Sequence, residues 1–455
     1  MTNFVYTILV SIVIISLGTF SFLQFCIIVL ELFFVFYFLN RIGTKFVYLE
    51  LLSLIAVTQW LFAPMLAQRL GVNMDVSYEV YFEYAFPATL AYLFGLTIPL
   101  WNQKRLDSTI SDIVKNIREK YYYRQQTGVI LILIGLPFWI LQNSSYTSLN
   151  YVFYLFSHLI MVGISLLLFT NYRFKWLWVC VIILILFYTS FLNGMIGSLI
   201  FWMFILLVIY SLNRPLKIPY LGRLLFLLLC IWIIIVLQAS KTEYRILTWD
   251  IRKNDMTGYV TREIKQNPQI FYSLIKENVL NPNKIFKDKN ILALTGRINQ
   301  GSLVATAMAH VPKREDYGRG EVTIRYSVEA FIPRILWPDK PNVGQADYIN
   351  KFAGLELGRF HSATLGALGD AYVDYGKYGF LFLGFMGFFV SGTFILFINK
   401  SKSTPTVLFW FLVLYFGTIS ITEISVAGYF NSVLKYVLFI VVVRFIINRL
   451  FKIGV

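Results

Sequence analysis

Apolar runs separated by short polar stretches make up most of the chain. A helix of about 20 apolar residues crosses the ~30 Å hydrocarbon core of a bilayer and satisfies its own backbone polar groups. The pattern therefore predicts an all-α polytopic membrane protein with about 12 spans. We expect them at residues 3–17, 19–39, 47–66, 83–101, 127–142, 149–170, 175–190, 194–212, 223–239, 379–398, 405–424 and 431–449.

One long segment of mixed composition interrupts this pattern after the ninth expected span. It divides the chain into an N-terminal membrane region at 1–239, a large extracytoplasmic loop domain at 240–378 and a C-terminal membrane region at 379–455. Composition agrees with this plan, because 58% of the residues are hydrophobic and only 14% are charged, which is more apolar than a soluble domain. We expect no cleavable signal peptide, since no basic region precedes the first apolar run.

Basic residues indicate the orientation. Outside segment 240–377 there are 20 Lys and Arg, and 18 of them lie in alternate loops or at the C-terminus. The positive-inside rule assigns that side to the cytoplasm. We therefore expect both termini in the cytoplasm and the loop domain on the periplasmic or extracellular face. The loop itself is basic, with 20 Lys and Arg against 15 Asp and Glu.

The sequence lacks the usual signatures of metal, nucleotide and disulfide chemistry. It contains no CxxC, HExxH, Walker A loop or dinucleotide fingerprint, and its three histidines are far apart. The cysteines all fall inside expected spans: Cys26, Cys180 and Cys230. We expect no metal, no cofactor and no nucleic-acid partner. Three acidic residues near span ends, Glu31, Glu50 and Glu423, are predicted to pack helices.

Several cations of the loop domain suit an anionic ligand. Lys241 and Arg245 lie four residues apart, on one face if the ninth span continues as a helix past the membrane. Arg297 begins an amphipathic stretch, TGRINQGSLVATAMAHVP at 295–312. The alternative for Lys241 and Arg245 is that they are snorkelling anchors at the membrane interface.

A proline-rich corner, FIPRILWPDKP at 331–341, carries Arg334 and Lys340. Each proline fixes its own φ and biases the preceding residue toward extended backbone, so the two cations are held in place. An arginine fork and a lysine point charge together suit a diphosphate. The alternative is a rigid Trp-Pro wedge that closes the loop onto the helices.

The candidate bases lie just before the tenth span, in HSATLGALGDAYVDYGKYG at 361–379. His361 and Asp370 are the candidates, and Asp370 shares a face with Asp374 if this stretch is helical. Helix capping by the aspartates and a surface imidazole at His361 are the alternatives. Two tyrosines are candidates to stack on sugar rings, with an interfacial aromatic belt as the alternative: Tyr372 and Tyr375.

These motifs together resemble the outer loop of bacterial O-antigen and capsular polysaccharide polymerases, the Wzy type. The similar features are an Arg before an amphipathic helix, the Pro-Arg-x-x-Trp-Pro-x-Lys-Pro corner, and acid-x-Tyr followed by Tyr-Gly-x-x-Gly. The sharp motifs occupy about residues 238–379, whereas the plan of spans and loop covers the whole chain. One departure is LNGMIGSL at 192–199, where Met195 stands in place of the arginine of a Gly-x-Arg often found in this family.

The resemblance implies a GT-C-like architecture and a glycosyltransferase in the bacterial inner or plasma membrane. A growing glycan on undecaprenyl diphosphate would be the donor, and a repeat unit on a second undecaprenyl diphosphate would be the acceptor. The leaving group is a diphosphate, so cations are expected beside it. Implied partners are these lipid-linked oligosaccharides, membrane lipids, a Wzz-type chain-length-regulating co-polymerase and a flippase.

Two other classes stay open at this point. An O-antigen ligase would use the same donor but pass the glycan to a lipid A core, and the sequence does not reveal the acceptor. A flippase or transporter would move lipid-linked oligosaccharide without making a bond. The large charged loop on one side disfavours a transporter, as does the lack of paired broken helices in two matching halves.

Overall fold

Every regular element of the described chain is a helix, and this part contains no strand. The expected all-α class is thereby confirmed for it. The computed structural model describes residues 7, 10, 18–142, 150–192, 196–249, 268–281, 283, 295–330, 332, 337, 346–356, 364–416 and 423–451.

The helices form two compact units. The larger unit comprises residues 1–175, 205–216 and 299–455, and the smaller comprises 176–204 and 217–298. The boundary at residues 298 and 299 divides the expected loop domain. The elements of the larger unit are α2 (Phe22–Arg41), α3 (Tyr48–Val57), η1 (Thr58–Phe62), α4 (Ala63–Arg69), α5 (Tyr78–Thr97), η2 (Ile98–Asn102), α6 (Gln103–Tyr121), α7 (Gln125–Leu141), α8 (Asn150–Ser157), α9 (Leu159–Leu168), α16 (Gln300–His310), η4 (Glu321–Arg325), α17 (Tyr326–Ala330), α18 (Ala346–Ala353), α19 (Gly366–Tyr375), η5 (Gly376–Tyr378), α20 (Gly379–Ser403), α21 (Val407–Trp410), η6 (Phe411–Phe416) and α23 (Val426–Phe451).

The smaller unit contains α12 (Tyr220–Trp249), α13 (Pro268–Leu280) and nearly all of α10 (Lys175–Leu192). Helix α11 (Ile196–Asn213) contributes residues to both units. In the smaller unit α13 packs against α12, with the rings of Tyr244 and Phe271 edge to face at 5.4 Å.

Among the described residues, seven helical stretches are long and apolar enough to cross a membrane: Phe22–Arg41, Tyr48–Arg69, Tyr78–Tyr121, Asn150–Leu168, Tyr220–Lys241, Gly366–Ser403 and Val426–Arg449. Four shorter apolar helices accompany them: Gln125–Leu141, Lys175–Thr189, Leu199–Asn213 and Val407–Phe416. Each expected span from the second to the twelfth therefore overlaps an apolar helix, although four of these helices are shorter than a span. The first, at 3–17, lies outside the described residues except for Thr7 and Val10.

The polar stretch between the fourth and fifth expected spans is itself helical, as α6. Its apolar side chains recur at helical spacing and are buried, which makes the helix amphipathic: Ile110, Ile113, Val114, Ile117 and Tyr121. Mean hydropathy does not identify such a helix as a span, because charged residues on its other face offset the apolar ones.

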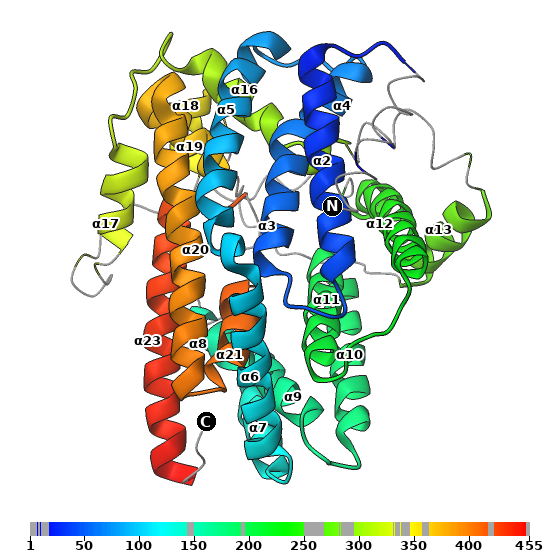
Figure 1. Cartoon of the computed structure of the whole chain (residues 1–455). Coiled ribbons are helices and arrows are strands. Elements are labelled where there is room, and N and C mark those ends of the chain that lie inside the picture. Colours follow the sequence, from blue (N-terminus) through cyan, green and yellow to red (C-terminus); the bar gives the residue numbers. More distant parts are fainter. Residues whose placement is uncertain are drawn as a thin grey trace, which may run out of the picture. The chain divides into compact units, whose positions relative to one another are not determined.

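Helices α5 and α20 run side by side in the same direction (Figure 1). Glycines allow their backbones to approach closely, as in many membrane helix pairs. A Cβ atom on Gly95 would lie 2.5 Å from the backbone nitrogen of Phe388, and one on Gly387 would lie 3.1 Å from that of Leu96. The hydroxyl of Ser391 donates to the carbonyl of Gly95 at 3.0 Å. These contacts hold α20 against α5, and α20 follows α19, which carries three of the candidate site residues.

Helices α16, α18 and α19 pack around a small hydrophobic core of their own. Its buried members include Ala307 on α16, Phe352 on α18 and Val373 on α19. This core holds α19 in place at the head of α20.

Candidate functional site

Two buried aspartates, one turn apart on α19, bind other parts of the larger unit. Asp370 is 0% exposed. One of its oxygens accepts a hydrogen bond from the hydroxyl of Tyr348 on α18, and the other accepts from the backbone nitrogen of Val426 at 2.8 Å. Val426 is the first residue of α23, whose early N–H groups have no partner within the helix. Asp370 therefore caps α23.

Asp374 makes the corresponding contacts with η4. Its carboxylate accepts from the backbone nitrogens of Val322 at 3.2 Å and Thr323 at 2.7 Å, and from the Thr323 hydroxyl at 2.7 Å. Tyr375 lies in the same cluster, with its hydroxyl 2.9 Å from that of Thr323. The two aspartates thus serve two different helix starts, which matches the capping alternative left open by the sequence.

Tyr348 is a hydrogen-bond donor to Asp370. Burial raises the pKa of its hydroxyl well above the ordinary range, and the neighbouring charge of Asp370 raises this pKa further. The hydroxyl therefore keeps its proton at neutral pH and donates it to the carboxylate. The contact connects α18 to α19.

A second polar contact of α18 reaches η4. Lys351 Nζ lies 2.9 Å from Glu321 Oε2 and 3.8 Å from Glu315 Oε1. Burial alone raises the pKa of Glu321, but the hydrogen bond and charge of Lys351, aided by the Tyr326 hydroxyl, outweigh burial. The net pKa of Glu321 is lower than its ordinary value.

A chain of polar contacts joins the starts of α16, α19 and α23. Gln300, the first residue of α16, donates to the carbonyl of Thr364 at 3.1 Å, and the Thr364 hydroxyl donates to the carbonyl of Glu423. Gln59, in the π-helical turn η1, donates to Glu423 Oε1 at 3.2 Å. Glu423 is partly exposed, whereas Asp370 and Asp374 are buried. We call these residues, together with Asp370 and Tyr348, the helix-start junction.

The structure brings together three of the residues predicted from sequence, Asp370, Tyr372 and Tyr375, on α19. The ring of Tyr372 lies 4.9 Å from that of Tyr84 and 6.2 Å from that of Tyr317. Tyr372 and Tyr375 are both partly exposed, so each retains some surface for a ligand. Stacking on sugar rings stays a prediction for both.

Three of the predicted cations belong to the smaller unit, whereas Asp370 and Asp374 belong to the larger one. Lys241 and Arg245 lie one turn apart on α12, which continues past the expected end of its span as their spacing requires. Lys241 is partly exposed, Arg297 is exposed, and both belong to the smaller unit, as does Arg245. Three further candidates lie outside the described residues: Arg334, Lys340 and His361.

The sequence did not single out Gln59, Tyr348 or Glu423 as site residues. Glu423 had a signal, because it is an acid among apolar and small residues in GTISITEIS at 417–425, but it was predicted to be a helix-packing residue. The sequence around Tyr348 and Gln59 carries no such signal, because their hydrogen-bond partners are remote in the chain. Within the described residues, no three His, Cys, Asp or Glu side chains are grouped so as to hold a metal ion.

Comparison with known proteins gives a family but no function. No curated protein and no solved structure matches the chain. One family matches residues 108–403, well over half of the chain, a range that contains α19, η4 and α20. The chain therefore belongs to the family described as a domain of unknown function (DUF8712).

Proposed function

We propose that this protein is a polymerase that joins undecaprenyl-diphosphate-linked oligosaccharide repeat units at the outer face of the bacterial plasma membrane. The observation that carries the proposal is the helix-start junction, where the partly exposed carboxylate of Glu423 lies beside the first turn of an apolar helix. Such a place suits a substrate whose tail lies in lipid and whose sugars lie in water. The loop motifs that resemble Wzy-type polymerases add cations for a diphosphate.

The reaction joins two lipid-linked glycans. A hydroxyl oxygen of the acceptor sugar attacks the anomeric carbon of the donor, the bond from that carbon to the diphosphate oxygen breaks, and undecaprenyl diphosphate leaves with the bonding electrons. A base takes the hydroxyl proton. We assign this role to Glu423, because both oxygens of Asp370 are already occupied by Tyr348 and Val426. A carboxylate held by a neighbouring amide, as Glu423 is by Gln59, is well placed for general-base catalysis.

The proposal includes the finer features of the expected architecture. These are about 12 crossings, a GT-C-like plan, cytoplasmic termini and a loop on the outer face. The overlap of apolar helices with the second to twelfth expected spans supports the number of crossings. The one-sided basic residues support the orientation.

The experiment is to incubate purified protein with lipid-linked repeat units and to separate the products on a gel. A ladder of lengthening glycans is expected. Transfer only to an added lipid A core would indicate a ligase, and no new bond would indicate a transporter; either outcome contradicts the proposal. A Glu423→Gln variant that melts like the parent protein in detergent should lose the ladder, with a rate lower by about 100-fold, as is usual when a general base is removed.

A further inference from the structure

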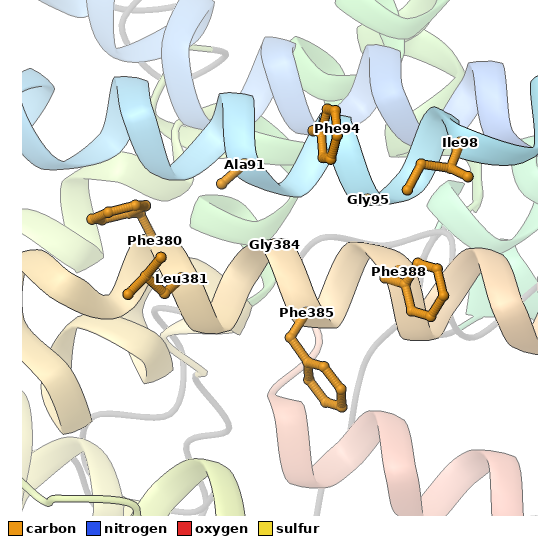
Figure 2. A pocket seen from close by; sticks show the side chains of 9 residues that line it. All are labelled: Ala91, Phe94, Gly95, Ile98, Phe380, Leu381, Gly384, Phe385 and Phe388. Carbon is orange, nitrogen blue, oxygen red and sulfur yellow. The ribbon is translucent and has the colours of Figure 1, made fainter. Parts of the chain in front are cut away.

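A groove of about 310 Å³ runs between α5 and α20 on their apolar outer faces (Figure 2). Its walls are aromatic, and Phe94, Phe385 and Phe388 are each more than half exposed. The complete lining is Ala91, Phe94, Gly95, Ile98, Phe380, Leu381, Gly384, Phe385 and Phe388. Both helices belong to stretches long and apolar enough to cross a membrane, and a lipid chain would meet the groove there.

Small residues produce the hollow. Figure 2 shows Gly95 and Gly384 facing each other between the two helices. A Cβ atom on Gly384 would lie 3.5 Å from the carbonyl oxygen of Ala91, so a methyl group is tolerated there but a longer side chain would project into the groove.

One end of the groove lies next to charged residues. Lys377 and Tyr378 immediately precede α20 and are exposed, and Lys377 Nζ lies 5.6 Å from the centre of the Tyr378 ring. On α5 the exposed Glu83 lies next to Tyr84, which contacts Gly379 at the start of α20. The charged head group of a lipid whose chain lies in the groove would therefore lie near these residues, about one turn before Phe380. Lys377 supplies a cation there for a phosphate.

The helix that lines one side of the groove follows α19 directly in the chain. Helix α19, which carries Asp370, leads through the single turn η5 into α20. The ring of Tyr375 at the end of α19 lies 5.7 Å from that of Phe382 in the first turn of α20. A lipid lying in the groove would therefore hold its head group beside α19.

We propose that this groove binds the polyprenyl chain of the lipid-linked substrate, with the diphosphate near Lys377; this inference rests on the proposed function. The methyl branches of a polyprenyl chain lie against the phenylalanine rings, and the single chain fits between the two helices. A bilayer phospholipid differs from this substrate in having two acyl chains and a single phosphate.

The test measures retention of undecaprenyl diphosphate by the purified protein, using native mass spectrometry, in competition with phosphatidylglycerol. Gly384→Leu fills the groove and should weaken retention about tenfold. Gly392→Leu is the matched control on the same helix, because no atom of the described residues lies within 4 Å of its Cβ position, and it should retain the lipid like the parent. Leu381 is an exposed residue of the groove wall, so Leu381→Trp should narrow the groove. This variant replaces Gly384→Leu in the test if Gly384→Leu fails to fold. Lys377→Gln should also weaken retention.

Equal retention by Gly384→Leu, Leu381→Trp and the control would overturn the inference, as would equal competition by phosphatidylglycerol. The outcome is separable from that of the proposed function. If the groove variants lose undecaprenyl diphosphate but the parent protein forms no glycan ladder, the lipid site is supported and the polymerase function is rejected. A glycan ladder together with equal lipid retention by the groove variants and the parent would support the polymerase and reject the lipid site in the groove.

Discussion

At the scale of single residues, carboxylates that lie close together have different environments. Asp370 is buried between α18 and α23 and has a donor on each oxygen, whereas Glu423 is partly exposed. Asp370→Ala removes a helix cap and leaves the hydroxyl of Tyr348 buried without its acceptor. We expect a loss of about 2–3 kcal/mol in the free energy of unfolding, measured as a lower melting temperature in detergent. An Asp370→Ala protein that melts like the parent would contradict the capping role.

The contact of Lys351 with Glu321 predicts a pH dependence. The folded-state pKa of Glu321 is lower than its ordinary value of 4.5, so the pair stabilises the protein above pH 4.5. This stabilisation is lost as the pH falls through the lower, folded-state pKa. Lys351→Met should therefore lower the melting temperature at pH 7, and the difference from the parent should shrink once the pH is below 4.5. A difference that stays constant or grows on acidification would refute this account.

At the scale of helices, the contact between α5 and α20 depends on glycine. A Cβ atom on Gly387 would collide with the backbone of Tyr92 and Leu96, whereas one on Gly392 meets no atom within 4 Å in the described part of the chain. Gly387→Ala should lower stability by about 1–3 kcal/mol through overpacking. Gly392→Ala should be neutral or slightly stabilising, because alanine favours a helix more than glycine does. Equal melting temperatures for the two variants would show that the close approach is unimportant.

Hydrophobicity alone predicted the membrane helices, because a span needs only a sufficient number of consecutive apolar residues. It did not predict α6, whose buried residues, such as Ile113 and Ile117, are interspersed with charges. It also could not predict the helix-start junction. The contacts of Asp370 with Tyr348 and Val426 join residues 22 and 56 positions away, and they form only after α18, α19 and α23 have packed. Short-range periodicity carries no information about such contacts.

At the scale of the whole molecule, the distribution of charge predicts the topology. The basic residues outside segment 240–377 lie almost entirely on one side of the expected spans, and the positive-inside rule predicts that this side is cytoplasmic. A reporter fused after Lys402 should behave as cytoplasmic, and a label near Asn283 should react from outside the cell. If the position near Asn283 is labelled only after the membrane is permeabilised, the predicted orientation is wrong and the proposed site does not lie on the outer face.

In the proposed reaction, a glycosidic bond forms between two lipid-linked glycans on the face that carries segment 240–377. The most direct measurement uses sealed vesicles with the protein in either orientation, checked by protease access to that segment, and lipid-linked repeat units supplied in the outer leaflet only. A glycan ladder should form where segment 240–377 faces outward and should be absent where it faces inward. A ladder confined to the inverted vesicles, or no new bond in either orientation, would contradict the proposed reaction.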